Sequence, residues 1–215
     1  MRVLLSILLA AALAGAASAA TVGAEHGTIV VNGKAITAGG RDAAPVLSPN
    51  GKRIVFLRGT GKTIPDCAGS GTGADTDVVE LWAANVDGSG ARKLLGVNSN
   101  SDMKKTMCGF EGAQFSSSGQ LLYFETPAWA TSGAIHVYDF RAGKEHFVID
   151  GEDAIVLAKC AEPDYRDKLV VTRHQYFVFG GSSYWPWLIG PDGKTLGLIG
   201  ADNVDLKKIV KAACG

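Results

Sequence analysis

A-P-V-L-S-P-N-G-K-R-I-V-F-L-R, residues 44–58, is the most informative segment of this chain. A short apolar run meets a Pro-Asn-Gly turn, and a strand of apolar residues leaves it. Ile54 and Phe56 share one face of this strand, and Val55 and Leu57 share the other. Because both faces are apolar, we expect the strand to be covered on both sides.

The same pattern returns further along the chain, which indicates a repeat. A second copy lies at Ala113–Glu125, where Ser116 takes the place of Ser48, and a weaker third copy lies near Asp164–Arg173. Each copy is followed by further β-rich runs around glycine-containing turns. A four-stranded meander of about 40–50 residues repeated in tandem is typical of propeller blades.

The sequence therefore predicts an all-β, β-propeller-like fold with three four-stranded blades, an N-terminal half blade and a short C-terminal helix. The half blade is the hairpin Thr28–Thr37, whose Asn32-Gly33 pair favours a tight type I′ turn. The third blade is the least regular unit. Its expected strands are Ala154–Lys159, Asp167–Arg173, Gln175–Phe179, Tyr184–Ile189 and Thr195–Ile199.

A helix at about residues 203–213 is predicted at the end of the chain. Asp202-Asn203 supplies a capping sequence, and apolar residues with helical spacing line one face. We expect this helix to cover an exposed sheet edge, fixed in place through Cys214. The apolar residues of that face are Leu206, Ile209, Val210 and Ala213.

The first 19 residues have the organisation of a secretory signal. Arg2 precedes an apolar run at Val3–Leu13, and Ala17-Ser18-Ala19 forms a cleavage signal. We therefore expect a periplasmic or secreted protein with one domain, residues 20–215, and no membrane span after cleavage. The formal net charge is +0 and no basic stripe is present, so nucleic acid is not an expected partner.

The four cysteines, Cys67, Cys108, Cys160 and Cys214, are expected to form disulfides in an oxidising compartment. Four cysteines allow three connectivities. We favour Cys67–Cys108 and Cys160–Cys214, because the first two both lie in loops outside the repeats. The chain has no C-x-x-C pair, so the spacing does not indicate a zinc site.

The segment Leu47–Phe56 resembles the repeat of TolB-like propellers, which reads roughly W-S-P-D-G-K-x-I-A-F, and Leu81–Ser89 is similar to that family's strand and turn. The resemblance covers about residues 28–199. It implies propeller blades in periplasmic or cell-surface proteins that bind other proteins. Six blades are common in that family, so this shorter array closes as a small ring or stays open and pairs with another copy as a homo-oligomer.

No catalytic, metal or cofactor motif is convincing. Gly59-Thr60-Gly61-Lys62-Thr63 lacks the first glycine of a phosphate loop, Asp75-Thr76-Asp77 is too short for a calcium loop, and Gly180–Tyr184 is not G-x-S-x-G. We expect a non-catalytic protein without a cofactor that binds an unknown periplasmic or cell-envelope protein. The binding rim is expected to consist of the loops Gly59–Asp77 and Asn98–Gly109.

An aromatic patch offers an alternative. Trp185 and Trp187 share one strand face, with Tyr184 opposite and Pro186 marking an edge or bulge. These rings either pack between blades or form an exposed surface for a protein, carbohydrate or small ligand. A hydrolase-associated propeller is a further alternative. The candidate surface comprises Tyr176, Tyr184, Trp185 and Trp187, with Phe177 and Phe179 nearby.

Overall fold

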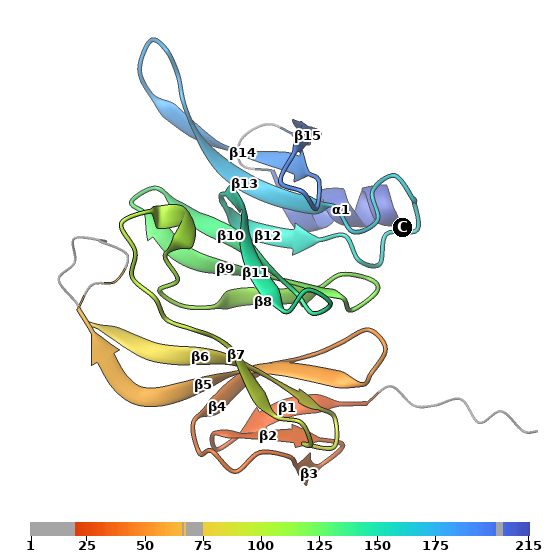
Figure 1. Ribbon diagram of the computed structural model, residues 1–215. Helices are drawn as coiled ribbons and strands as arrows, with labels where there is room; N and C mark the ends of the chain where they lie inside the picture. The colour runs from red at the N-terminus through yellow and green to blue at the C-terminus, as the bar shows by residue number, and fades with distance from the viewer. Residues whose placement is uncertain (1–19, 66, 68–74, 201–203) are drawn as a thin grey trace, which may run out of the picture.

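The computed structural model describes residues 20–65, 67, 75–200 and 204–215. The predicted signal, residues 1–19, and the predicted cap Asp202-Asn203 lie outside the described residues. Four antiparallel sheets follow one another in chain order and are stacked face to face (Figure 1). The predicted all-β, propeller-like architecture is confirmed, and the array of sheets is not closed.

Each four-stranded sheet is a simple meander, with strands hydrogen-bonded in sequence order. The N-terminal sheet contains β1 (Val22–Glu25), β2 (Thr28–Val31) and β3 (Lys34–Ala35). The first blade contains β4 (Asp42–Leu47), β5 (Arg53–Ile64), β6 (Thr76–Asn85) and β7 (Arg92–Gly96). The second contains β8 (Glu111–Phe115), β9 (Leu121–Trp129), β10 (Ser132–Asp139) and β11 (Lys144–Asp150). The third contains β12 (Glu152–Val156), β13 (Leu169–Tyr176), β14 (Ser182–Ile189) and β15 (Thr195–Leu198).

Because neighbouring strands are antiparallel, the connections between them lie on two opposite rims of the array. One rim, here called the loop rim, carries the second turn of each blade and the crossovers between blades, and it lies on the left in Figure 1. The opposite rim carries the first and third turns of each blade. The predicted binding loops and the β13–β14 hairpin therefore share one rim.

Apolar layers between neighbouring sheets form the core. Ile54 and Phe56 of β5 pack against Ile29 of the N-terminal sheet, whereas Val55 packs against the second blade. A third layer joins the second and third blades, with Tyr123 among its buried residues. The prediction that the central strand is covered on both faces is confirmed.

A buried serine has the same structural role in the first two copies of the repeat. The Ser48 hydroxyl oxygen accepts a bond from the Arg53 N–H at 2.9 Å and closes the turn between β4 and β5. Ser116 does the same for the Leu121 N–H at 3.1 Å between β8 and β9. Both serines are only 2% exposed. Gly51, with φ of 67°, supplies the left-handed residue of the first turn.

The two ends of the array differ in part from expectation. The predicted hairpin Thr28–Thr37 is present, with Asn32 and Gly33 at φ of 50° and 76°, but β1 adds a third strand to it. The predicted strand Gln175–Phe179 is wrong. β13 continues to Tyr176, and Phe177–Gly181 forms the hairpin turn, in which the Gly180 N–H donates to the Phe177 carbonyl at 3.0 Å.

The C-terminal helix α1 (Leu206–Cys214) is present, capped by Asp205, whose carboxylate accepts from the Lys208 N–H at 3.1 Å. It covers a sheet face rather than the predicted edge. Its residues Leu206 and Val210 pack against Val170 of β13, on the far side from the second blade. No helix in the described ranges is long and apolar enough to cross a bilayer.

Both favoured disulfides are present. Cys67 and Cys108 are joined with Cα atoms 5.5 Å apart, and Cys160 and Cys214 with Cα atoms 4.4 Å apart. The first bond ties the β5–β6 connection to the crossover into the second blade. The second ties the last residue of α1 to the segment after β12.

Replacing either turn serine should lower stability, because the strand N–H that it accepts from would lose its buried partner. We expect Ser48→Ala and Ser116→Ala each to cost about 1–2 kcal/mol in urea unfolding. Ser101→Ala, at an exposed position, is the matched control. A serine variant as stable as the control would contradict this role for the hydroxyl.

Removing the second disulfide should release α1, since an isolated nine-residue helix is marginal in water. We expect Cys160→Ser/Cys214→Ser to expose the Lys207–Lys211 segment to trypsin while the blades stay resistant. Equal resistance of the segment in both proteins would show that apolar packing alone holds the helix.

Candidate binding surface on the loop rim

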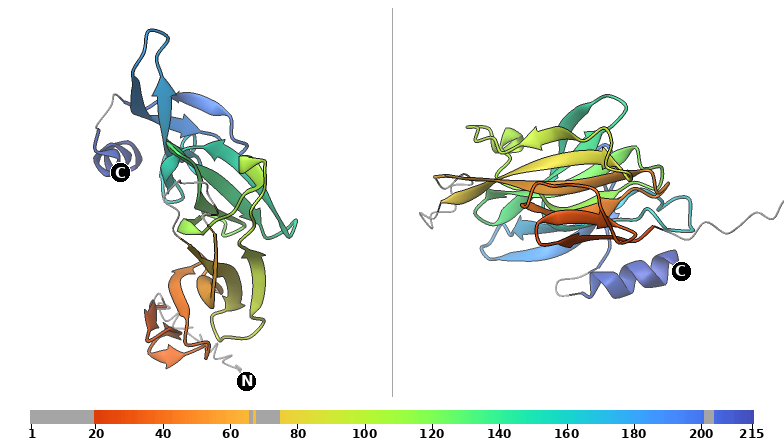
Figure 2. Two further views of the ribbon diagram at one scale, coloured as in Figure 1. Left: turned by 90° about the vertical axis from the view of Figure 1, so that its left-hand side faces the viewer. Right: turned by 90° about the horizontal axis from the view of Figure 1, so that it is seen from below.

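The β13–β14 hairpin projects from the third blade and is the most prominent feature of the loop rim (Figure 2). Its turn carries large apolar side chains that have almost no cover. Val178 is 95% exposed and Phe179 103%, and Tyr176 at the start of the turn is 73% exposed. An apolar cluster left in water on an otherwise well-packed protein indicates a contact surface.

The structure divides the predicted aromatic patch. Tyr176 and Tyr184 are exposed, and both rings lie close to the His174 ring, with centroid distances of 4.4 and 4.7 Å. Trp185 is partly buried and contacts Phe177, with ring centroids 6.0 Å apart. The hairpin therefore presents the tyrosines and the turn, backed by Trp185.

Trp187 does not share this surface. It packs against the buried layer between the second and third blades, so for this residue the packing interpretation is correct. Pro186 does not mark an edge, because β14 is the third of four strands. The Pro186 carbonyl accepts from the N–H of Ile199, the residue that follows the end of β15. Proline has no N–H to donate, and its position is the one at which the pairing of β14 with β15 ends.

Acidic side chains gather beside the hairpin at the inner strands. Glu111 of β8 lies directly opposite Glu125 of β9 in the strand register. Like charges at opposed positions of an antiparallel pair are destabilising. Glu152 and Asp153 of β12 face the same region. Burial raises the pKa of Glu125, and the carboxylates of Asp153 and Glu152 add to this rise. The sequence reasoning missed this cluster, because the four acids are brought together only by stacking of two blades.

A bulge at the start of β12 completes the cluster. Asp153 has φ of 54°, and its N–H donates to the Glu125 carboxylate at 3.0 Å. Below it, the Gln114 side-chain amide bonds with the β12 backbone, donating to the Ala154 carbonyl at 2.6 Å and accepting from the Val156 N–H at 3.1 Å. The Gln114 side chain thus links the second blade to the third by two hydrogen bonds to the β12 backbone.

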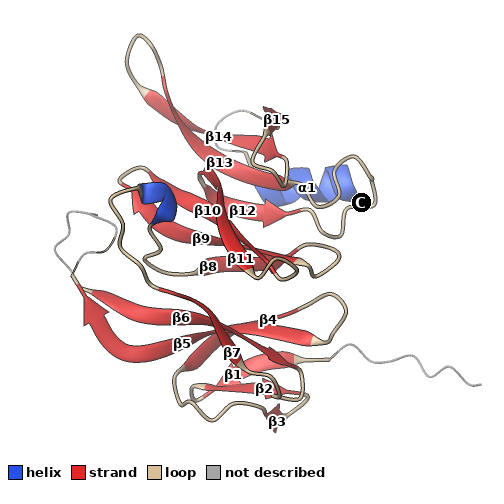
Figure 3. Cartoon of the chain, viewed as in Figure 1, coloured by secondary structure: helices blue, strands red, loops and turns tan. Residues whose placement is uncertain are grey.

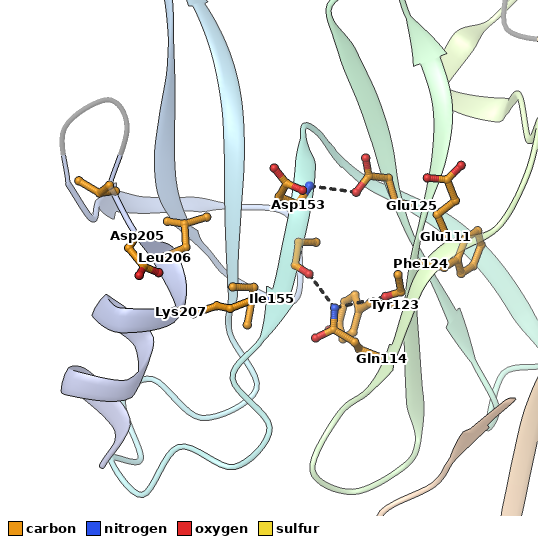
Figure 4. A pocket seen from close by; sticks show the side chains of 13 residues that line it. Glu111, Gln114, Tyr123, Phe124, Glu125, Asp153, Ile155, Asp205, Leu206 and Lys207 are labelled. Carbon is orange, nitrogen blue, oxygen red and sulfur yellow. Dashed lines mark hydrogen bonds between the residues drawn. The ribbon is translucent and has the colours of Figure 1, made fainter. Parts of the chain in front are cut away.

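These residues line a cavity of about 760 Å³ between the second blade, β12 and the start of α1 (Figure 4). Burial raises the pKa of Glu125 to about 7, with the Asp153 carboxylate adding to the effect. Burial also raises the pKa of Glu152. Lys207 is the basic residue that lines this cavity, entering from the helix side in Figure 4.

The cavity continues toward the hairpin. A second cavity of about 330 Å³ shares Glu111 and Glu125 with it and reaches Trp129 and Tyr184. A third, of about 480 Å³, shares Trp129 with the second and reaches Tyr176. These three neighbouring cavities are here together called the rim groove.

Of the predicted binding loops, Gly59–Asp77 lies in part outside the described residues, at 66 and 68–74, and its two ends belong to β5 and β6. Residues 98–109 include the short helix η1 (Met103–Lys105), and Lys104 lines the outer end of the rim groove. Gly59-Thr60-Gly61-Lys62-Thr63 lies in β5, which rules out a phosphate loop there. Among the described residues, no three His, Cys, Asp or Glu side chains are arranged to hold a metal ion.

No family model and no curated protein matches this chain. Solved structures do. The β-propeller domain of the trilobed protease from Pyrococcus furiosus, which has an open velcro topology, aligns with a TM-score of 0.52 at 15% identity, covering 81% of this chain and 48% of that one. Dipeptidyl peptidase 4 from Porphyromonas gingivalis aligns with a TM-score of 0.50 at 11% identity, covering 86% and 31%. TolB from Acinetobacter baumannii aligns with a TM-score of 0.46 at 17% identity, covering 84% and 40%.

The protein thus has a β-propeller-like fold, built as an open array of blades. It spans about half the length, or less, of the propeller-containing chains that it matches. At these identities the likeness concerns the fold alone.

Glu125 should make stability depend on pH. Its pKa is near 7 in the folded protein and near 4.5 in the unfolded chain, so the folded state holds the proton more tightly, and stability falls as pH rises from about 4.5 through 7. Glu125→Gln should remove this dependence and stabilise the protein at pH 8 by about 1–2 kcal/mol, allowing for solvent screening at a half-buried site.

Thermal melts between pH 4.5 and 8.5 check this prediction. Glu111, Glu152, Asp153, Asp205 and Lys207 face the same cavity region, and the curve for Glu162→Gln, an exposed acid on the opposite rim, serves as the control. Parallel curves for wild type and Glu125→Gln would place the titrating group elsewhere.

Proposed function

We propose that this protein is an exported, non-catalytic binding protein that engages another protein of the periplasm or cell envelope through the β13–β14 hairpin. One observation carries the proposal: the hairpin holds Phe177, Val178 and Phe179 in solvent on a ribbon that projects from the stacked blades. Aromatic side chains on a preordered element are the residues that dominate protein contacts.

The surroundings support the assignment. Two disulfides fit an oxidising compartment. The hairpin is ordered by its full strand register from Leu169↔Ile189 to Tyr176↔Ser182, so little conformational freedom is lost when the turn is buried. The TolB-like fold is one that presents loops on a rigid scaffold.

The carbohydrate alternative is weaker on this geometry. A sugar-binding platform from Trp185 and Trp187 would need both indoles at the surface, and Trp187 packs in the inter-blade layer. No observation on the described residues favours a hydrolase-associated role.

The test is chemical cross-linking in native envelope extract with wild type and Phe177→Ser/Phe179→Ser. We expect the double variant to lose about tenfold or more of each specifically captured protein, because it loses the apolar tip. Leu196→Ser, another exposed apolar residue at 44% exposure, should leave capture unchanged. Identical capture by the tip variant and wild type would contradict the proposal.

A further inference from the structure

The large apolar side chains that the described residues leave exposed gather in two places. One group lies on the β13–β14 hairpin and belongs to the proposed protein contact. The others, Tyr165, Leu196 and Leu198, are 40%, 44% and 46% exposed, and all three line one cavity at the C-terminal end of the array. This cavity shares no lining residue with the rim groove, so it is a second apolar site.

The cavity has a volume of about 340 Å³ and lies between α1 and β15, here called the helix cavity (Figure 1). Leu196 and Leu198 line it from β15, and Ile209 and Ala213 line it from α1. None of the described side chains that line it carries a charge, and Tyr165 supplies the one hydroxyl group. Small-molecule sites in proteins are mainly apolar and begin at about this volume, roughly 300 Å³.

The helix does not close this space. Leu206 and Val210 of α1 pack against the sheet, but no residue of the helix is buried. The Cys160–Cys214 disulfide fixes the end of α1 to the segment after β12, so the helix forms a wall at a set place. Protein interiors leave few voids larger than a water molecule, so a preformed apolar space of this size indicates an occupant.

Basic side chains border the helix cavity on both sides. Lys194 directly precedes β15, Lys208 adjoins Ile209 on α1, and α1 carries two further lysines, Lys207 and Lys211, and no acidic residue. Among the described residues none of these four ammonium groups forms an ion pair. An apolar space bordered by unpaired cations is complementary to a molecule with an apolar body and an anionic end.

The dimensions favour a single alkyl chain. The four residues of β15 span about 13 Å, and the nine residues of α1 span about the same length. At roughly 30 Å³ for a group of the size of water, 340 Å³ holds roughly ten methylene groups. Both acyl chains of a phospholipid exceed this space.

From these features we propose that the helix cavity binds a single-chain anionic amphiphile, of the class of a free fatty acid. Its alkyl chain lies between the leucines of β15 and the apolar side of α1, and its carboxylate lies at the basic border, within reach of Lys194 or Lys208. The inference goes beyond the proposed function and does not depend on the β13–β14 hairpin.

The experiment is isothermal titration calorimetry of the full chain, after removal of bound lipid, with octanoate, dodecanoate and dodecanol. We expect dodecanoate to bind about tenfold or more tightly than octanoate, because each further buried methylene adds to the affinity. Dodecanol has the same chain length without the charge, so it reports on the apolar contact alone.

A variant that fills the helix cavity tests its location. Ala213→Trp places an indole in the cavity, and we expect it to weaken dodecanoate about tenfold or more. Ala212→Trp, at the neighbouring exposed position that does not line the cavity, is the matched control and should bind as wild type does. Leu198→Glu, which places a carboxylate on the β15 side, should give the same loss and replaces Ala213→Trp if that variant melts below its control.

A second pair of variants tests the anionic end. Lys194→Glu/Lys208→Glu should weaken dodecanoate about fivefold and leave dodecanol unchanged, because only the carboxylate interacts with the ammonium groups. Lys52→Glu/Lys144→Glu makes the same change of charge at exposed positions of the first two blades and should alter neither ligand.

Absence of dodecanoate binding, or equal affinity of Ala213→Trp and Ala212→Trp, overturns this inference. So does binding to phosphatidylglycerol vesicles without binding of dodecanoate, since the occupant would then be a two-chain lipid. Equal weakening by the two lysine double variants overturns the anionic end of the ligand. Capture of proteins through the hairpin is measured separately, so failure of this site and failure of the proposed function are distinguishable.

Discussion

Every blade of this protein depends on burial of both faces of its central strands. β5 shows the constraint plainly, since Ile54 and Phe56 are buried on one side and Val55 on the other, all at 0% exposure. A single meander of this composition would leave one apolar face in water, so no sheet is stable without a neighbour on each side. Stacking is therefore a condition of folding here.

An array that does not close has to solve the same problem at its ends. At the C-terminal end α1 lies over Val170 of β13 and turns Lys207, Lys208 and Lys211 to solvent. At the other end a three-stranded sheet presents Ile29 and Val31 inward. Both terminal elements work as polar-faced caps, which repeat proteins require for solubility.

The repeat made most of this architecture predictable. Ser48 and Ser116 mark the same buried turn, and the glycine turns mark the strand pairs, so the number of blades could be predicted from the repeat. The disulfide pairing was favoured because Cys67 and Cys108 both lie in loops outside the repeats, and both bonds are present. The hairpin turn was misassigned because Tyr176–Phe179 has high strand propensity but lies where the chain must reverse.

The acid cluster could not be predicted from the sequence. Glu125 and Asp153 are far apart in the sequence, and their contact depends on a left-handed residue in β12 that no local pattern indicates. The packing of β12 beside β9 of the second blade brings the two residues together.

The uncovered hairpin also has a consequence for the behaviour of the protein in concentrated solution. A ribbon that holds Val178 and Phe179 in water is a self-association risk at high concentration. Neighbouring carboxylates oppose such contact between identical copies through repulsion. We therefore expect this small region to govern self-association of the protein, because its acidic side chains oppose contact between the exposed aromatic side chains of two copies.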